Sequence, residues 1–317
     1  MRKILLSVGP VSALLAMPSA ASAADTAATD PASFTLGEIV VTAEHHSGQM
    51  IGSSTLGSEA IYTFQRDSLD QAAQLIPGVS AGTTGNSRNE RLIYVRGFDR
   101  YQVPLSIDGI RIYLPADGRL DYGRFLTPDI AEVQIAKGYA SVLDGPGAMG
   151  GAVNLVTRKP SKPLEAEARF TLNLDRDGGY GGYTAFGTLG TRHERWYAQA
   201  SFARNFTDHW DLAGGFTPTA NENGGARDFS RTSDWRVNAK VGFTPNGSDE
   251  YALSYTRQEG EKLAPVHVGD PPALLRFWTW PWWDLENIYF LSTTRLSDGA
   301  TLRLRLYYNR FENSLDS

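Results

Sequence analysis

The sequence predicts a mixed α+β domain followed by antiparallel strands of a transmembrane β-barrel. After residue 163, apolar and polar residues alternate in runs of about ten, the length that a tilted strand needs to cross a bilayer. Before residue 160, one helical pattern and several short strand patterns are separated by turn signals. A β-sandwich would use shorter strands, so strand length favours the barrel.

The first 23 residues predict export from the cytoplasm through the Sec pathway. A positively charged start at residues 1–3 precedes a short apolar stretch at residues 4–16. Residues 21–23, Ala-Ser-Ala, then form a cleavage site of the signal-peptide type. The apolar stretch is too short to be a stable membrane anchor, so we expect it to be removed from the mature protein.

The composition excludes several classes of function. The 317 residues contain no cysteine, which excludes a disulfide framework and thiolate chemistry in metal binding or catalysis. The formal net charge of −5 gives no support to nucleic-acid binding. The histidines are scattered, and the neighbours His45 and His46 do not by themselves make a metal site.

Residues 24–52 form a low-complexity polar tail that contains one strongly β-prone segment. Its residues are Glu38, Ile39, Val40, Val41, Thr42 and Ala43. Such a segment cannot bury itself locally. It either adds a strand to the sheet edge of a partner, a known mode of peptide recognition, or forms the first strand of the following domain. The residue types favour these two alternatives about equally.

Residues 53–160 predict a small mixed domain with one short helix. Ser68 as the N-cap and Gln71 three positions later form a capping-box candidate. Apolar residues at 69, 72, 73 and 76 then fall on one helical face, and Pro77-Gly78 ends the helix. Strand patterns follow at 92–95, 105–107 and 110–113, and Asp108-Gly109 is a two-residue hairpin signal between the last two.

The glycine-rich stretch at 132–160 offers two interpretations. Residues 145–150, Gly-Pro-Gly-Ala-Met-Gly, match the dinucleotide-binding fingerprint GxGxxG, which requires a helix after its glycines. Residues 152–157 are instead rich in β-branched side chains and lead to Pro160, so a strand is expected there. We therefore expect a tight strand–loop–strand crossover, and a nucleotide-dependent oxidoreductase is disfavoured.

The clearest long strands are expected at 165–174, 196–202, 235–243 and 302–307. Short connections are expected near 190–194, 245–249 and 297–300, and long ones at 207–230 and 258–280. Short turns at one end and long loops at the other are the asymmetry of outer-membrane barrels. The connection at 175–180, at the end that carries the long loops, is expected to be brief.

Several ordered motifs together resemble the N-terminal part of a TonB-dependent outer-membrane receptor of the siderophore and cobalamin type. They are residues 67–80, 94–99, 105–110 and, above all, 132–160. The resemblance implies a signal peptide at 1–23, a periplasmic tail at 24–52 with a TonB box at 38–43, a plug domain at 53–160 and barrel strands at 161–317. Such receptors close about 22 strands around the plug, whereas about seven can be placed here, so we expect a longer gene product.

The resemblance also implies a function. It indicates active transport across the cell outer membrane of a Gram-negative bacterium, with a ferric siderophore as the expected substrate. Uptake of cobalamin or another chelate, or a passive porin-type barrel, are the alternatives. The implied partners are TonB, with ExbB and ExbD in the inner membrane, the ferric chelate and outer-membrane lipid, and no nucleic acid. No bond is made or broken, so no enzyme activity, catalytic residue, cofactor or resident metal is expected.

Candidate ligand contacts come from two regions. Two segments of the plug, residues 85–90 and 115–124, could form its apex and offer Arg88, Arg91, Arg119, Tyr122 and Arg124. The densest aromatic cluster of the chain, residues 277–283, offers Trp278 and Trp280. These tryptophans either stack on a planar aromatic chelate or belong to an aromatic girdle at the membrane interface, and the girdle is the favoured interpretation.

Overall fold

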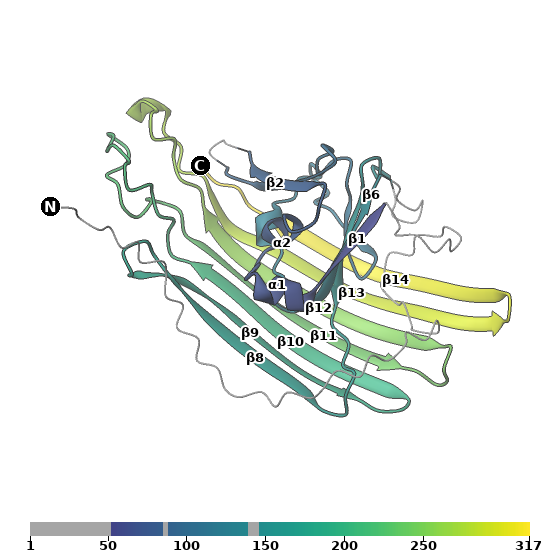
Figure 1. Ribbon diagram of the computed structural model, residues 1–317. Coiled ribbons are helices and arrows are strands. Elements are labelled where there is room, and N and C mark those ends of the chain that lie inside the picture. The colour runs from purple at the N-terminus through teal and green to yellow at the C-terminus, as the bar shows by residue number, and fades with distance from the viewer. Residues whose placement is uncertain (1–51, 85–87, 139–145) are drawn as a thin grey trace.

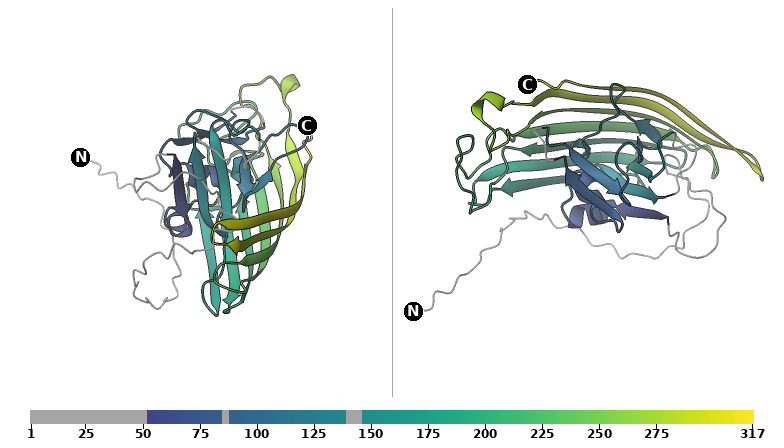
Figure 2. Two further views of the ribbon diagram at one scale, coloured as in Figure 1. Left: turned by 90° about the vertical axis from the view of Figure 1, so that its right-hand side faces the viewer. Right: turned by 90° about the horizontal axis from the view of Figure 1, so that it is seen from above.

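The computed structural model describes residues 52–84, 88–138 and 146–317. A small domain, built from residues 52–157, lies against one face of a long, curved antiparallel sheet that begins at residue 165 (Figures 1 and 2). The predicted signal segment and residues 38–43 lie outside the described ranges. None of the helices within those ranges is long and apolar enough to cross a membrane.

The small domain is built around a five-stranded sheet with the order β1-β6-β7-β4-β5. Neighbouring strands are antiparallel, except that β4 and β7 run parallel. The strands are β1 Ser53–Gly57, β4 Leu105–Ile107, β5 Ile110–Ile112, β6 Ile130–Lys137 and β7 Gly151–Thr157. A separate pair is formed by β2 Val79–Thr83 and β3 Arg91–Val95, and the helices are α1 Ser58–Thr63, α2 Leu69–Ala73 and the short 3₁₀ helix η1 Tyr122–Arg124.

The helix predicted after Ser68 is confirmed as α2, with a different arrangement of its cap. Its apolar face is fully buried in the domain core, and Gly78, at φ +81°, follows its end. The Gln71 side chain accepts a hydrogen bond from the backbone N–H of Asp67 at 3.2 Å. Ser68 instead donates to the Asp70 carboxylate at 2.5 Å, because a charged acceptor competes strongly for its hydroxyl.

The glycine-rich crossover is confirmed within residues 146–157, whereas Gly145 lies outside the described ranges. Gly150 leads directly into β7, which pairs antiparallel with β6, so a strand follows these glycines in place of a helix. Gly151 has a φ of +131°, and a Cβ there would overlap the carbonyl oxygen of Ala136. A Cβ at Gly150 would overlap Phe98. The glycines therefore allow close packing of the backbone, and the dinucleotide interpretation is excluded by the missing helix.

The hairpin predicted at Asp108-Gly109 is also confirmed. Both residues have positive φ, +49° and +74°, as a type I′ turn requires. The turn carries Asp108, whose carboxylate is completely buried. It becomes one of the main contacts between the small domain and the long sheet.

The long sheet contains seven strands within the described residues, in the order β14-β13-β12-β11-β10-β9-β8 with all neighbours antiparallel. They are β8 Glu165–Leu174, β9 Tyr180–Arg192, β10 Trp196–Thr207, β11 Thr232–Phe243, β12 Glu250–Leu263, β13 Thr279–Ser297 and β14 Ala300–Asn313. The connections at 193–195, 244–249 and 298–299 are short, as predicted. The two long outer loops, residues 208–231 and 264–278, lie at the other end, and the second contains η3 Pro272–Leu274.

The small domain has its own apolar core, which continues into the long sheet at one place. Buried side chains of α2, β3, β4, β6 and β7 pack together in this core. Trp283, Leu285 and Phe311 of the long sheet join it, and the Trp283 ring meets Phe125 edge to face at a centroid distance of 5.4 Å. The inner face of the sheet is therefore the face that the small domain covers, and alternate residues point outward.

Candidate functional site

Charged side chains on the inner face of β11 attach the small domain to the sheet. Asp234, Arg236 and Lys240 all point inward, because strand residues two positions apart share a face. Each pairs with a side chain of the small domain, and all six side chains are at most 3% exposed. The pairs are Arg124–Asp234, Asp129–Arg236 and Asp108–Lys240.

The Asp108 carboxylate lies at the centre of the Asp108–Lys240 contact. It accepts hydrogen bonds from Lys240 Nζ at 2.8 Å, from the Thr157 N–H at 2.8 Å and hydroxyl at 2.6 Å, and from the Tyr289 hydroxyl. Burial opposes ionisation, but the Lys240 charge and these hydrogen bonds outweigh it and hold the pKa of Asp108 below its usual value. The Asp108 carboxylate is therefore favoured in its ionised form, and its charge is balanced by Lys240 and by its hydrogen-bond donors.

A second group of charges lies closer to the long outer loops. Lys262 Nζ donates to Asp121 at 2.6 Å and to the Asn89 carbonyl at 2.8 Å. Burial opposes ionisation of Asp121, yet the Lys262 charge lowers its pKa. Arg124 donates to Asp234 at 2.8 Å and stacks on the Trp283 ring at 5.2 Å.

Gly260 on β12 makes room for this group of charges. A Cβ at this position would overlap both the Asp234 carboxylate and the Arg124 guanidinium. The β-ladder between β12 and β13 also shifts register between Gly260 and Lys262. The sequence signal for this residue, an isolated glycine inside an alternating strand, indicates a bulge or a close approach.

At the outer end, two arginines of the small domain stack on tryptophans of the long loops. The Arg88 guanidinium lies 5.6 Å from the Trp278 ring, and that of Arg91 lies 5.5 Å from the Trp210 ring. Arg88 and Trp278, two predicted ligand contacts, are thus brought together. Arg119 is separate from them, and its exposed side chain pairs with Asp117 at 3.3 Å.

The remaining predicted contacts are buried. Tyr122 is 1% exposed, and Arg124 is 2% exposed in its pair with Asp234. Trp280 is 6% exposed and lies on the inner face, beneath the Lys262 ammonium group at 5.3 Å. Trp282 faces outward and is 43% exposed. The aromatic cluster is therefore divided between the two faces of the sheet and the adjoining loop.

The two long outer loops are joined by a contact that the sequence pattern does not reveal. The Asn221 side-chain amide donates to three carbonyls of the second loop, those of His267, Val268 and Asp270, at 3.3, 3.2 and 2.8 Å. Phe229 and Phe277 add an edge-to-face contact at 5.3 Å. Among the residues that the structure describes, no group of three or more His, Asp or Glu side chains is arranged to hold a metal ion.

The comparisons with known proteins agree with this architecture. Residues 49–152 match the family described as TonB-dependent Receptor Plug Domain. Curated relatives include the vitamin B12 transporter BtuB of Vibrio vulnificus, 29% identical over 123 residues, or 38% of this chain and 20% of the relative. The corresponding protein of Photobacterium profundum is 29% identical over 193 residues, or 59% of this chain and 30% of the relative. The chain thus spans less than a third of these relatives.

Solved structures with the same fold include the copper transporter OprC and the FrpB iron transporter of Neisseria meningitidis (F5-1 variant). Their TM-scores are 0.63 and 0.65, at 15% and 16% identity. The match covers 84% and 82% of this chain and 38% and 40% of theirs. A plug domain seated on antiparallel barrel strands defines the class of plugged β-barrel receptors. The small domain belongs to the TonB-dependent receptor plug family and is called the plug below, and the chain as a whole is similar to the N-terminal portion of TonB-dependent receptors.

Proposed function

We propose that the chain belongs to an energy-coupled receptor that carries a scarce metal chelate across the outer membrane. The observation that supports this most is the plug itself, fixed across the inner face of the barrel strands by buried ion pairs. Such a plug obstructs free diffusion, so passage requires that it move. A passive porin, the alternative function, needs no folded domain in its lumen.

The ligand is proposed to bind at the outer end, between the plug and the two long outer loops. The Arg88–Trp278 and Arg91–Trp210 stacks meet there, and Arg119 lies on an exposed part of the plug. Guanidinium groups and indole rings suit an anionic ligand with planar aromatic groups. This chemistry favours a ferric siderophore. The vitamin B12 transporters among the sequence relatives make cobalamin the second candidate.

Energy is proposed to enter through residues 38–43, the predicted TonB box. An extended segment in a polar tail suits strand addition to a periplasmic partner, here TonB acting with ExbB and ExbD. The proposed organisation is a signal peptide at 1–23, a periplasmic tail at 24–52, the plug at 53–160 and barrel strands at 161–317. Export through the Sec pathway belongs to the same proposal. The chemistry is transport, without a catalytic residue.

Deletion of residues 38–43 in the whole protein tests the mechanism. Energised uptake should be lost while ligand binding at the cell surface persists, because the proposed ligand contacts do not include residues 38–43. Deletion of six other residues of the tail, 25–30, is the matched control and should leave uptake intact. Undiminished uptake after the first deletion would reject TonB coupling through this segment.

The substrate is best identified by growth. A strain that lacks the protein should lose growth on one chelate in a panel of iron and cobalamin sources, and the restored gene should recover it. Loss on a ferric siderophore alone would support the first candidate, and loss on cobalamin alone the second. Normal growth on the whole panel, together with restored permeation of small solutes by the protein, would favour the passive barrel.

A further inference from the structure

The outward face of β8, β9 and β10 carries a single charged side chain among the described residues, Arg204. The inward positions of these strands are fixed by contacts with the plug and the neighbouring wall. Thr184 donates to Asp67 of the plug, and Tyr197 donates to Glu250 on the inner face. Because side chains alternate, Arg204 points to the opposite side, away from the plug.

Arg204 lies over an aromatic ring and has no acidic partner in the part of the chain that the structure describes. Its guanidinium lies 5.8 Å from the Tyr183 ring, and its Nε atom is buried without a hydrogen-bond acceptor. Tyr183 stacks in turn on Phe170 and Phe206, both at 5.7 Å. Arg204 is therefore a cation in an apolar setting whose hydrogen-bonding capacity is unused at Nε.

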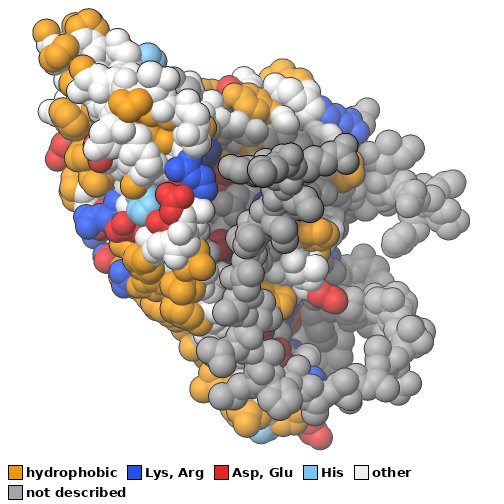
Figure 3. All heavy atoms as spheres, turned by 60° about the vertical axis from the view of Figure 1, so that its left-hand side comes forward, with side chains coloured by type: hydrophobic (Ala, Val, Ile, Leu, Met, Phe, Trp, Pro, Cys, Tyr) orange, Lys and Arg blue, Asp and Glu red, His pale blue; other side chains and the backbone are white. Residues whose placement is uncertain are grey.

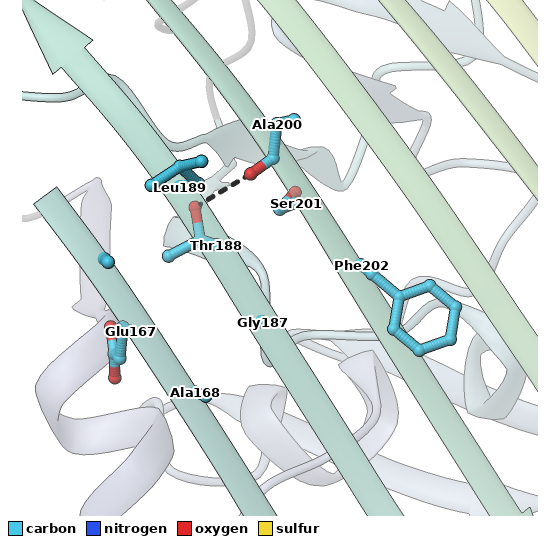
Figure 4. A pocket seen from close by; sticks show the side chains of 9 residues that line it. Glu167, Ala168, Gly187, Thr188, Leu189, Ala200, Ser201 and Phe202 are labelled. Atoms are coloured by element: carbon cyan, nitrogen blue, oxygen red, sulfur yellow. Dashed lines mark hydrogen bonds between the residues drawn. The ribbon is translucent and has the colours of Figure 1, made fainter.

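An apolar groove lies directly beside Arg204 on the same face. Small residues of three neighbouring strands form its floor, and Leu189 and Phe202 stand at its sides (Figure 4). On the outward side its lining is Ala166, Ala168, Gly187, Leu189, Ala200 and Phe202. Phe202, which lines the groove, is the outward neighbour of Arg204 on β10, and the Arg204 guanidinium lies on the side of the long loops, over Tyr183.

The position of Arg204 along the strand fits the outer rim of the apolar band. Trp196, which is 45% exposed and stacks on His193, lies at the opposite, short-turn end of β10. Eight residues separate the two, roughly 27 Å along a strand at about 3.4 Å per residue. With a strand tilt of about 40°, this is roughly 20 Å along the membrane normal, close to the height of about 25 Å expected for the band.

Other outward charges near this level are paired with one another. Arg257 on β12 donates to Glu259 at 2.7 Å and lies 3.5 Å from Glu286, and Arg310 donates to Glu312 at 2.8 Å. Figure 3 shows apolar side chains gathered along the sheet, with charged side chains between them and the long loops. Arg204 differs from these arginines because its charge is not balanced by a neighbour, and a phosphate would balance it.

We infer that Arg204 and the groove bind a phosphate-bearing lipid of the outer leaflet, with an acyl chain in the groove and the phosphate on the guanidinium. A guanidinium binds phosphate in a bidentate, charge-assisted manner, and the Tyr183 ring holds it in place. The small side chains provide the space that an acyl chain needs. This inference rests on the proposed location in the outer membrane and adds a lipid site outside the transport path.

The test measures lipid binding to the whole purified protein by native mass spectrometry. The probes are lipid A, its dephosphorylated form with the same acyl chains, and inorganic phosphate. The unaltered protein should bind lipid A about tenfold more tightly than the dephosphorylated lipid, as expected for a hydrogen-bonded ion pair. Arg204→Gln should remove this preference, Arg204→Lys should keep part of it, and Arg257→Gln, the matched outward arginine, should keep it fully.

The groove is tested separately. A Cβ at Gly187 would have no neighbour closer than 3.9 Å, so Gly187→Leu fits the sheet and should fill the groove. This variant should bind both lipids several-fold more weakly. An unchanged preference for lipid A in Arg204→Gln would overturn the inference. Displacement of lipid A by an equal concentration of inorganic phosphate would also overturn it, since the site would then be one for a free anion.

The deletion of residues 38–43 separates this inference from the proposed function. That variant should bind lipid A as the unaltered protein does, although its uptake should be lost. Arg204→Gln should in turn keep uptake. If uptake depends on residues 38–43 but lipid binding does not depend on Arg204, then the lipid site alone is wrong. The opposite result would reject the transport mechanism and leave the lipid site.

Discussion

The interior of the plug and its contact with the barrel sheet are built from different interactions. Inside the plug, residues such as Leu105, Ile107 and Val133 are at most 1% exposed and belong to the apolar core cluster. At the sheet, the contact is dominated by buried ion pairs and hydrogen bonds, with one apolar anchor around Trp283. The plug core and the plug–sheet contact are both buried, but the first is apolar and the second is largely ionic.

Because of this difference, the folding of the plug and its docking onto the sheet depend on different interactions. Apolar packing stabilises a domain without directional partners, whereas buried ion pairs contribute little net stability because desolvation offsets their attraction. Ion pairs do, however, strongly disfavour a misplaced plug, because each misplacement leaves a buried charge without a partner. We therefore expect the plug to remain folded when its attachment to the barrel sheet is broken.

The chain contains no cysteine, so single introduced cysteines can report the two events separately. Ser254 lies on the inner face of β12 and is 1% exposed, so the thiol of Ser254→Cys should become reactive when the plug leaves the sheet. Ala73 lies in the plug core and is 0% exposed, so the thiol of Ala73→Cys should become reactive when the plug unfolds. In urea, we expect position 254 to react at a lower concentration than position 73. Coincident reaction would contradict the separation of docking from folding.

The largest effect on docking is expected from Asp234→Ala. This change leaves the Arg124 guanidinium buried without its acid and should weaken docking by about 3–5 kcal/mol, seen as faster labelling of position 254. Labelling of position 73 should change little. The double variant Arg124→Met with Asp234→Leu removes both charges and should recover most of the loss. Equal loss in the single and double variants would show that the loss does not come from an unpaired buried charge.

The matching change inside the plug is Leu105→Ala. Loss of this buried side chain should lower the free energy of plug unfolding by about 2–5 kcal/mol, measured by labelling of position 73 in urea. Leu105→Met, which nearly conserves volume, is the control and should cost less than about 1.5 kcal/mol. If Leu105→Ala affected position 254 alone, the proposed division between core and contact would be wrong.

Acid should release the plug before it unfolds the plug core. The pKa values of Asp108 and Asp121 are lowered in the folded protein from an ordinary value of 3.8. Their contribution to docking is therefore complete above that value and is lost as the pH falls through the lowered pKa. Hydrogen exchange of residues 250–263, measured by mass spectrometry, should increase below about pH 4. In Asp108→Asn this acid-dependent increase should be smaller, and an identical pH profile would exclude Asp108 as its source.

The smallest effect is expected at the outer end of the contact. Arg88→Ala removes a partly exposed cation–π contact with Trp278 and should weaken docking by about 0.5–1 kcal/mol. Arg119→Ala, whose partner Asp117 belongs to the plug itself, should not change docking. The rate of cysteine labelling at position 254 measures docking in both variants. A loss in Arg88→Ala as large as in Asp234→Ala would mean that the outer stacks, rather than the buried ion pairs, hold the plug.

Features encoded locally could be predicted from the sequence. The helix after Ser68, the Asp108-Gly109 turn and the strand after Gly150 each follow from residues within a few positions of one another. The alternation of barrel residues and the unequal lengths of the loops are likewise visible along the chain. These features predict the class of fold, and the agreement of several ordered motifs indicates the family to which the plug belongs.

Contacts between the two parts could not be predicted, because they depend on the position of the plug against the wall. Arg124 was predicted as a ligand contact in a plug segment that could form the apex, yet it pairs with Asp234, 110 residues away. The position of Trp280 could not be predicted either. The β12–β13 ladder shifts register between Gly260 and Lys262, so simple alternation along β13 does not assign Trp280 to the inner face. Residue type indicates a possible role, and the partner across the interface decides it.

Gly260 shows what this arrangement implies for variation in the chain. The volume that a side chain would take at this strand position is filled by two charged groups, one from the plug and one from the neighbouring strand. The smallest possible substitution, a methyl group for a hydrogen atom in Gly260→Ala, would therefore act like the removal of an ion pair. A position that contributes no side chain of its own therefore determines whether the plug fits against the sheet.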